Sequence, residues 1–460
     1  ATYHRWGRDE RRPGWAEMWD RDQDRYLVAR DEWLAGHVRT LRAWLVDYAR
    51  TRSVQDRLSR GETPEYVEQA NVTRLMRANG IEDLEELRKR AVEDPEWYWD
   101  AVVKDLDIRF FDPYSTVRTP QEQPTPDLWF ADGGINVTDA CVDRHATDAE
   151  RADQTALIGE SEDGEVRTLT YRELAREVDA VARGLLAEGV GKGDTVAVFM
   201  PMVPEAVIAA YAIAKIGAIY VPIFSGFAAS AITSRLVDSG CAVVLTADGT
   251  WRRGKHGEMK PVLDEAVAAA PAVRRVVVLD RLGLDVQFDP ARDITWDDFT
   301  APYRSDEPLA CEPTRAEDGF MLAYTSGTTG KPKGVFHVHG GFTVKIASEV
   351  AYQTDLHAGE VLYWVTDMGW IMGAWSMVGT HVIGGTMVMY EGAPDFPNPD
   401  RVWDMAERHK VAMLGISPTL IRALRAKGDK WHHDHDLFSV RILGSTGEPW
   451  NPEPYEWLSE

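Results

Sequence analysis

The 460-residue chain is long enough for more than one domain, and hydrophobic residues make up 44% of it, which allows a sizeable core. Its formal net charge of −23 disfavours nucleic acid and anionic membranes as partners. No apolar run reaches the roughly 20 residues that a membrane helix needs, and the N-terminus lacks the apolar core of a signal peptide. We therefore expect a cytoplasmic protein. The sequence leaves its oligomeric state open.

Two further features of the composition bear on environment and metal chemistry. Only 12 of the 51 basic residues are lysine, and such a surplus of carboxylates is typical of proteins adapted to high salt; an ordinary acidic cytosolic enzyme is the alternative. Cys141, Cys241 and Cys311 lie far apart, which argues against a disulfide framework and against a zinc site. We expect each to be a small buried hydrophobe and predict no metal ligands.

Residues 1–61 differ from the rest of the chain. The first 60 residues hold 13 arginines, no lysine and 10 acidic residues, together with five tryptophans. We predict an atypical N-terminal extension over residues 1–61. It is either a basic accessory arm or non-native sequence placed upstream of the true start, and we assign it no function.

The next segment, residues 62–140, begins with a charged helical pattern and continues into an extended stretch. Acidic residues precede basic ones by helical spacing near residues 82–90. Prolines at positions 113, 120, 124 and 126 then predict a linker.

From residue 171 onward, short apolar runs alternate with amphipathic stretches. The runs predict buried strands and the stretches predict helices, so their alternation indicates βαβ units. We therefore predict the α/β class, with parallel sheets flanked by helices. The predicted strands are 195–200, 218–222, 242–246, 275–279, 320–324, 361–365, 386–390, 411–416 and 440–443, and the predicted helices are 171–188, 204–217, 228–239 and one that begins at 341.

The strongest local signal is the segment 324–334, which reads YTSGTTGKPKG. Its hydroxyls, flexible glycines and lysines suit a loop that wraps polyphosphate oxygens and neutralises them. The glycine spacing excludes a Walker P-loop, and a plain flexible surface loop is the alternative. We expect residues 325–331 to form a loop between a strand and a helix.

The segment 325–334 resembles the phosphate-binding signature of the adenylate-forming enzymes, which include acyl-CoA synthetases, peptide-synthetase adenylation domains and luciferases. An ordered series of other segments resembles acetyl-CoA synthetases, and the series covers residues 62–460. The resemblance identifies 62–140 as a helical arm and linker of the acetyl-CoA-synthetase type, and 141–460 as an incomplete AMP-binding, adenylate-forming domain whose small C-terminal partner domain is missing. The segments are 129–130 (WF), 136–137 (NV), 143–145 (DRH), 200–206 (MPMVPEA), 223–227 (IFSGF), 246–248 (TAD), 367–370 (DMGW), 391–394 (EGAP), 417–424 (SPTLIRAL) and 444–449 (GSTGEP).

The resemblance implies a role for four groups of residues. The groups are a set that binds the ATP phosphates (Thr325, Ser326, Gly327, Thr328, Thr329, Gly330 and Lys331), an adenine-side turn (Gly447, Glu448 and Pro449), an acyl pocket (Trp370, Ile371, Met372 and Gly373) and a CoA-binding set (Arg252, Lys255 and Asp395). A glycine in the adenine-side turn would let the backbone approach a planar ring.

Four of these positions depart from the pattern of the acetate enzymes. Ile371 and Met372 stand where those enzymes usually have valine and threonine, so we expect both acetate and propionate to be used, with a graded preference. Lys255 replaces an arginine, which keeps the charge and loses the bidentate fork. Asp395 stands where an asparagine is common.

The resemblance implies ATP-dependent activation of a short-chain acid to acyl-AMP and then acyl-CoA, with release of AMP and pyrophosphate. It also implies Mg²⁺, with its ligand beyond the chain end, and a catalytic lysine that lies beyond the end as well. We therefore expect slow turnover from the 460-residue chain. Two alternatives stay open: a non-catalytic nucleotide- or acyl-binding protein on this fold, and an adenylation domain that serves a carrier protein.

Overall fold

The computed structural model describes residues 15–20, 25–30, 64–122, 125–325, 332–428, 431 and 434–459. The chain divides into two compact units. One consists of Ala1–Gln69, Ser417–Arg425 and Thr446–Glu460, and the other of Ala70–Ile416 and Ala426–Ser445. Among the described helices, none is both long and apolar enough to cross a membrane.

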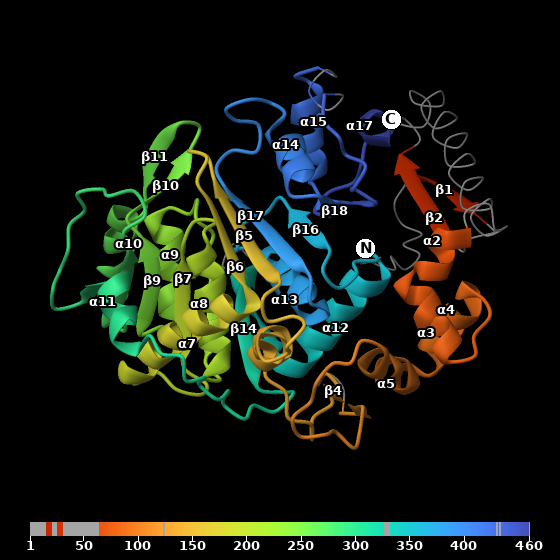
Figure 1. Ribbon diagram of the computed structural model, residues 1–460, viewed down its shortest axis with the longest axis horizontal. Coiled ribbons are helices and arrows are strands. Elements are labelled where there is room, and N and C mark those ends of the chain that lie inside the picture. The colour runs from red at the N-terminus through yellow and green to blue at the C-terminus, as the bar shows by residue number, and fades with distance from the viewer. Residues whose placement is uncertain are drawn as a thin grey trace. The chain divides into compact units, whose positions relative to one another are not determined.

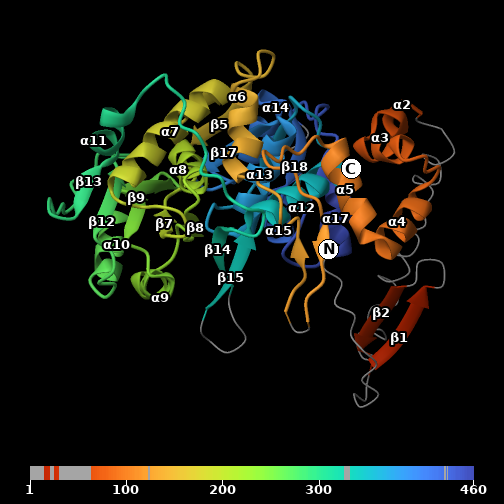
Figure 2. The same ribbon diagram turned by 90° about the horizontal axis from the view of Figure 1, so that it is seen from below.

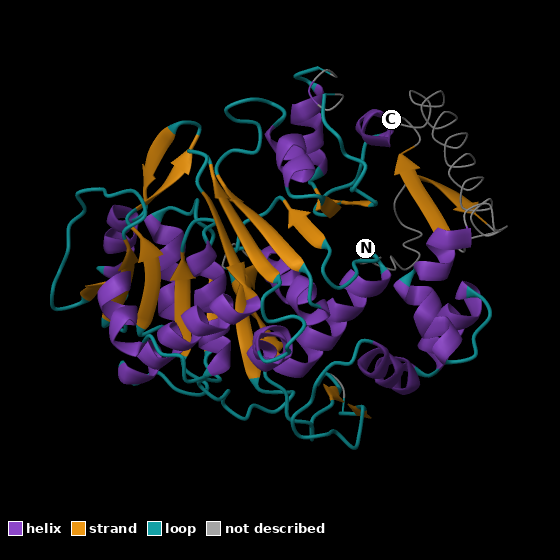
Figure 3. Cartoon of the chain, viewed as in Figure 1, coloured by secondary structure: helices purple, strands orange, loops and turns teal. Residues whose placement is uncertain are grey.

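The larger unit contains two sheets that are parallel except at one edge strand each (Figure 1). This arrangement, with helices beside the strands (Figure 3), confirms the predicted α/β class. The seven-stranded sheet runs in the order β13 (Asp293–Thr295), β12 (Arg275–Leu279), β9 (Val243–Ala247), β7 (Thr195–Phe199), β8 (Ile219–Pro222), β14 (Gly319–Thr325) and β15 (Lys333–Val338). The six-stranded sheet runs in the order β19 (Ile442–Gly444), β18 (Val411–Gly415), β16 (Val361–Trp364), β17 (Thr386–Glu391), β5 (Thr155–Ser161) and β6 (Val166–Thr170).

The central strands are apolar on both faces because helices cover both faces of the seven-stranded sheet. On one face, strand residues such as Val244 and Val276 pack with the helices α9 (Ala229–Ser239) and α10 (Lys260–Val267). On the other face, Val243 and Val277 share a core with α7 (Tyr171–Ala187) and α8 (Pro204–Lys215). Figure 2 shows the two helix pairs on opposite sides of this sheet.

Helix α8 lies between the two sheets of the larger unit. It contacts β7 and β8 of one sheet and β5 of the other. Every residue of Pro204–Lys215 is buried, as expected for a helix that is hydrophobic all round. The structure describes these further helices and short strands in this unit: α3 (Asn71–Ala78), α4 (Leu84–Glu93), α5 (Pro95–Asp105), η1 (Asp139–Asp143), α6 (Arg144–Ala146), α11 (Trp296–Thr300), η2 (Ala301–Tyr303), α12 (His339–Tyr352), α13 (Ile371–Ile383), α14 (Arg401–Arg408), the hairpin β3–β4 (Arg118–Thr119, Leu128–Trp129) and the hairpin β10–β11 (Gly249–Arg252, Lys255–Glu258).

The described part of the smaller unit contains an antiparallel hairpin and three short helices. The hairpin pairs β1 (Trp15–Asp20) with β2 (Arg25–Arg30) inside the predicted N-terminal extension. The helices are α2 (Pro64–Gln69), α15 (Pro418–Arg425) and α17 (Pro452–Ser459).

Two sequence-based expectations are wrong. The segment 325–331 does not lead from a strand to a helix, because β15 follows it and pairs antiparallel with β14, with Tyr324 opposite Gly334. The glycine and lysines of 331–334 predict a loop locally, whereas main-chain hydrogen bonds to β14 make residues 333–338 a strand. The second correction concerns Cys311, which is partly exposed and donates its thiol to Asp143 at 3.2 Å, whereas Cys141 and Cys241 are buried as expected.

Candidate active site

The predicted phosphate-binding residues follow β14, a strand inside the seven-stranded sheet. Thr325 is the exposed last residue of β14, and residues 326–331 lie outside the described part of the chain. At the end of this strand the Tyr324 hydroxyl donates to Asp238 of α9 at 2.7 Å. Arg235, also on α9, lies over the rings of both Tyr324 and Phe227, at 5.6 and 4.3 Å. These contacts connect the base of the loop with the aromatic segment 223–227.

The predicted acyl segment lies against the same aromatic segment. The ring of Trp370 packs on Phe224, with centroids 5.1 Å apart, and on Phe227, with centroids 6.0 Å apart. The Ser225 hydroxyl donates to Asp367 at 2.5 Å. A Cβ added to Gly369 would lie 2.2 Å from the backbone of Phe224, so only glycine permits this close approach. The tertiary structure thus brings together two segments that are far apart in the sequence.

The four predicted acyl-pocket residues have different environments. Trp370 and Ile371 remain exposed, at 46% and 44%. Met372 is partly buried and packs against the main core. Gly373 is buried, and a Cβ added to it would lie 2.6 Å from the Cα of Met368. Trp370 precedes α13 in an extended conformation, so its side chain stands at the N-terminal end of that helix.

Burial raises the pKa of Asp367, and the hydrogen bonds from Ser225 and from the Gly369 amide oppose this rise. The positive charge of Arg252 opposes it as well. One predicted CoA-binding residue therefore acts electrostatically on the turn that carries the predicted acyl pocket. This coupling relates the two predicted sites within the larger unit.

Arg252 and Lys255 face each other across the β10–β11 hairpin, where they form the last paired position before the turn. Both side chains are exposed. The third predicted CoA-binding residue, Asp395, instead forms an ion pair with Arg253, at 2.6 Å. Arg253 was missed by sequence reasoning, although its place in a two-residue turn between short strands was a usable signal.

The predicted adenine-side turn lies in the smaller unit. Gly447 has φ of +99°, a backbone conformation that favours glycine. The Glu448 carboxylate accepts hydrogen bonds from the Thr419 hydroxyl and from Arg422, the latter at 2.7 Å, and these lower the pKa of Glu448. Pro449 follows directly. Arg422 is a partner of the turn that the sequence analysis did not assign.

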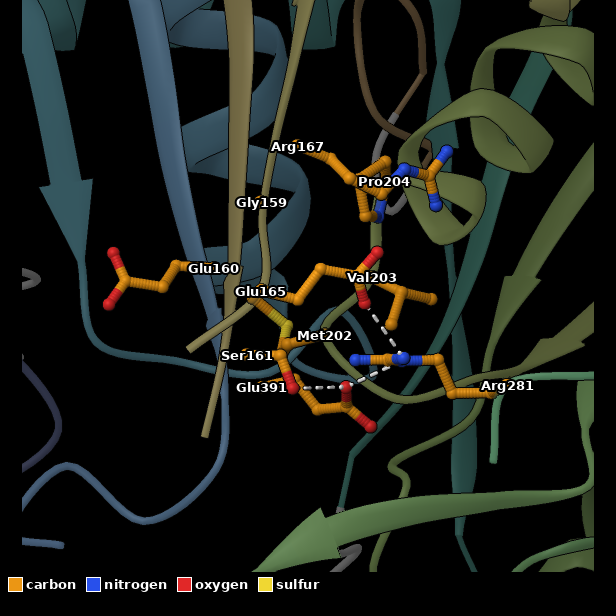
Figure 4. Close-up of a pocket in the computed structure, with 10 residues that line it drawn as sticks. All are labelled: Gly159, Glu160, Ser161, Glu165, Arg167, Met202, Val203, Pro204, Arg281 and Glu391. Atoms are coloured by element: carbon orange, nitrogen blue, oxygen red, sulfur yellow. Dashed lines mark hydrogen bonds and ion pairs between the residues drawn. The ribbon is translucent and has the colours of Figure 1, made fainter. Parts of the chain in front are cut away.

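A small polar pocket lies beside the ends of β5 and β17 (Figure 4). Its cavity of about 20 Å³ has room for little more than a water molecule, so it is too small for a nucleotide or CoA. Figure 4 shows Arg281 between two carboxylates: its Nε donates to Glu391 at 2.9 Å, and its Nη1 donates to Glu165 at 3.1 Å. Burial raises the pKa of Glu391, and Arg281 opposes this rise.

Among the described residues, no group of three or more His, Cys, Asp and Glu side chains is arranged to hold a metal ion.

Two family models match the chain. The model for the AMP-binding enzyme matches residues 143–460, and the model for the acetyl-coenzyme A synthetase N-terminus matches residues 84–141. The chain therefore belongs to the AMP-binding enzyme family.

Three similar proteins are named as acetyl- or acetoacetyl-CoA synthetases. The acetyl-coenzyme A synthetase of Methanothrix thermoacetophila is 39% identical over 90% of this chain and 62% of its own length. The enzyme of the same name from Gemmatimonas aurantiaca is 41% identical over 81% of this chain and 57% of its own length. The structure of acetoacetyl-CoA synthetase from Streptomyces lividans matches with a TM-score of 0.79 and 29% identity, over 85% of this chain and 60% of that one. The chain thus spans about three fifths of these relatives.

Proposed function

We propose that this chain supplies the ATP- and acid-binding part of an AMP-forming acid–CoA ligase that acts on a short-chain carboxylic acid such as acetate or propionate. In the first step a carboxylate oxygen attacks the α-phosphorus of ATP, which forms an acyl-adenylate and releases pyrophosphate. In the second step the thiol of CoA attacks the acyl carbon and displaces AMP. Family membership and the names of the similar proteins support this reaction class.

The observation that carries the proposal is the exposed aromatic surface at the start of α13. Trp370 keeps 46% of its surface exposed although its ring packs on Phe224. An indole that served only the core would be buried, whereas one held at the surface by aromatic partners suits the wall of a small apolar pocket.

The remaining predicted residues bind the substrates of these two steps. Residues 325–331 hold the ATP phosphates through hydroxyls, backbone amides and Lys331, the turn 447–449 lies against the adenine, and Arg252 and Lys255 hold the nucleotide phosphates of CoA. Mg²⁺, when bound with the nucleotide, would supply positive charge that reduces the repulsion between the phosphates and the attacking carboxylate. Catalysis then consists mainly of aligning two anions and stabilising the charge that develops between them.

The deciding experiment identifies the nucleotide products. The 460-residue chain, and a version extended to the length of its relatives, are supplied with ATP, Mg²⁺, CoA and either acetate, propionate or isobutyrate. We expect acid-dependent AMP and pyrophosphate. Formation of ADP and phosphate would refute the proposed reaction.

The same assay separates the two alternatives. A carrier-serving domain would form acyl-AMP yet make no thioester with free CoA. A non-catalytic binding protein would bind ATP and show no acid-dependent product in either version. The basic pair Arg252 and Lys255 on an otherwise acidic protein favours CoA as the acceptor.

A further inference from the structure

The turn of the β10–β11 hairpin has an unusual residue at a strained position. Arg253 has φ of +53° and Gly254 has φ of +68°, so both turn residues are in the left-handed region. Two-residue hairpin turns of this kind strongly favour Asn-Gly, because a long side chain on an L-residue is disfavoured there. The presence of arginine therefore calls for a compensating interaction.

The compensation is an ion pair with a carboxylate outside the hairpin. The Arg253 guanidinium donates to Asp395 at 2.6 Å, and the Asp395 side chain is only 9% exposed. A carboxylate this buried is unfavourable unless a charged donor neutralises it. Arg253 and Asp395 therefore stabilise each other across the gap between the turn and the segment that follows β17.

Two more carboxylates bind the backbone of the same hairpin. Glu391, at the end of β17, accepts hydrogen bonds from the Thr250 hydroxyl at 3.0 Å and from the Trp251 amide at 3.1 Å. Glu162, just after β5, accepts from the amide of Gly254 and from that of Ala393 at 2.8 Å. We call Glu162, Glu391 and Asp395 the carboxylate clamp.

The clamp itself is held by the residues around the small pocket. Arg281 and the Ser161 hydroxyl donate to the second oxygen of Glu391, at 2.9 and 3.3 Å (Figure 4). Glu162 is 7% exposed and Glu391 is 2% exposed. Buried carboxylates with several directional donors have few alternative positions, so the hairpin is fixed from β5, from β17 and from the segment after β17.

We infer that Arg253 and Asp395 are positioning residues for CoA: their ion pair, with the rest of the carboxylate clamp, holds the β10–β11 hairpin so that Arg252 and Lys255 project together toward the nucleotide phosphates. The inference rests on the proposed CoA-binding role of Arg252 and Lys255. It assigns Asp395 a contact with the hairpin instead of a contact with CoA. A bare carboxylate facing a phosphate would repel it, whereas one neutralised by Arg253 does not.

The competing arrangement has Arg253 itself bind the phosphates, with Asp395 as an anion that competes for it. The two arrangements predict opposite signs for Asp395→Asn. If Asp395 positions the hairpin, the substitution weakens CoA binding. If Asp395 competes with CoA for Arg253, the substitution strengthens CoA binding.

The test is calorimetric titration of the 460-residue chain with CoA and with 3′-dephospho-CoA at one fixed ionic strength. We expect Asp395→Asn and Arg253→Asn each to raise the Kd for CoA about three- to fivefold, the scale of a partly exposed ion pair. Because the partners act as one unit, the double variant should resemble either single variant. The Kd for the dephospho form should change less, so the ratio of the Kd for dephospho-CoA to the Kd for CoA falls.

Stability provides a readout that separates positioning from simple structural support. The double variant Arg253→Asn with Asp395→Asn creates the favoured Asn-Gly turn and leaves no unpaired buried carboxylate, so its Tm should stay equal to that of the wild type or rise while CoA affinity falls. Arg253→Lys should retain part of the affinity. The matched control is Arg88→Gln, which removes another exposed arginine, paired with Glu85 at 2.9 Å on α4, and should leave both Kd values unchanged.

Three other outcomes of these titrations would refute the inference, and each points to a different explanation. Tighter CoA binding by Asp395→Asn refutes positioning and favours direct contact by Arg253. Unchanged affinity in both single variants refutes the clamp and leaves the CoA site intact. If the wild-type chain itself binds no CoA, both the clamp and the CoA half of the proposed function fail, while acid-dependent pyrophosphate release would still support adenylation.

Discussion

At the scale of single residues, the acyl segment depends on close backbone approach more than on side-chain size. Gly369 lets the turn 367–370 lie directly on the backbone of Phe224, and this contact sets where Trp370 stands. Asp367 adds a directional hydrogen bond from Ser225. Trp370 and Ile371 are then left at the surface, and Met372 is the first residue of α13 that reaches the core.

Met372 is therefore the residue at which acid size can be tested. If its flexible side chain borders the acyl pocket, Met372→Thr in the extended version should lower the ratio of kcat/KM for propionate and butyrate to that for acetate, by about tenfold, since one methylene in such a pocket is worth about 1–3 kcal/mol. The matched control is Met76→Thr, another partly buried methionine packed in the separate core of α3–α5. It should reduce stability without altering the ratio. An unchanged ratio for Met372→Thr would identify this residue as core packing.

At the scale of elements, a buried lysine joins three helical segments near the centre of the larger unit. Lys215, 1% exposed at the end of α8, contacts Asp143 of η1 at 2.9 Å and Asp179 of α7 at 2.5 Å. Burial raises the pKa of Asp143, which the charge of Lys215 opposes, and the carboxylates in turn raise the pKa of Lys215. The lysine stays charged at neutral pH, and its removal would leave two poorly solvated carboxylates.

We expect Lys215→Met to lower the free energy of unfolding by about 3–5 kcal/mol at pH 8. The loss should shrink as the pH falls, because Asp143 then takes up a proton and no longer needs a cation. Urea unfolding at pH 8 and pH 5 measures both values. Lys345→Met, which removes an exposed i,i+4 pair with Glu349 on α12, should cost no more than about 0.5 kcal/mol at either pH. A cost for Lys215→Met that grows toward acid would contradict the ion-pair account.

At the scale of the whole molecule, three buried histidines make stability sensitive to acid. Burial lowers the pKa of His145 and His339 to about 3 and that of His381 to about 4. All three are neutral in the fold, whereas in the unfolded chain they bind protons near pH 6.5. Their contribution to stability is therefore complete above pH 6.5 and is lost as the pH falls toward their folded pKa values.

The stability loss can be assigned to one histidine by comparing slopes. Between pH 6 and pH 4.5 each buried histidine should contribute up to about 1.4 kcal/mol per pH unit to the fall in unfolding free energy. His145→Gln should reduce the slope of unfolding free energy against pH by the amount that one proton contributes, whatever the substitution does to stability at neutral pH. Guanidinium unfolding across this range gives the slopes, and equal slopes for wild type and variant would show that His145 is already protonated in the fold.

Much of the fold could be predicted because its elements are determined by local patterns. Runs such as 195–200 and 275–279 are continuously apolar, so they form strands covered on both faces, and Pro204 and Gly217 border α8 as their backbone preferences require. The family could also be predicted from the sequence, because the predicted motifs lie within the residues that the two family models match. The ligand roles of those residues remain predictions.

Local residue patterns were enough to predict the α/β class, the approximate bounds of most strands and helices, and the chemistry of the motifs, because each depends on neighbours within a few positions along the chain. Three features required the folded structure: residues 333–338 pair as a strand with β14, Phe224 and Phe227 support Trp370, and Asp395 binds Arg253. These contacts join residues far apart in sequence. Main-chain pairing, ring stacking and ion-pair choice depend on which segments the packed core brings within a few ångströms, and local residue patterns carry little information about that.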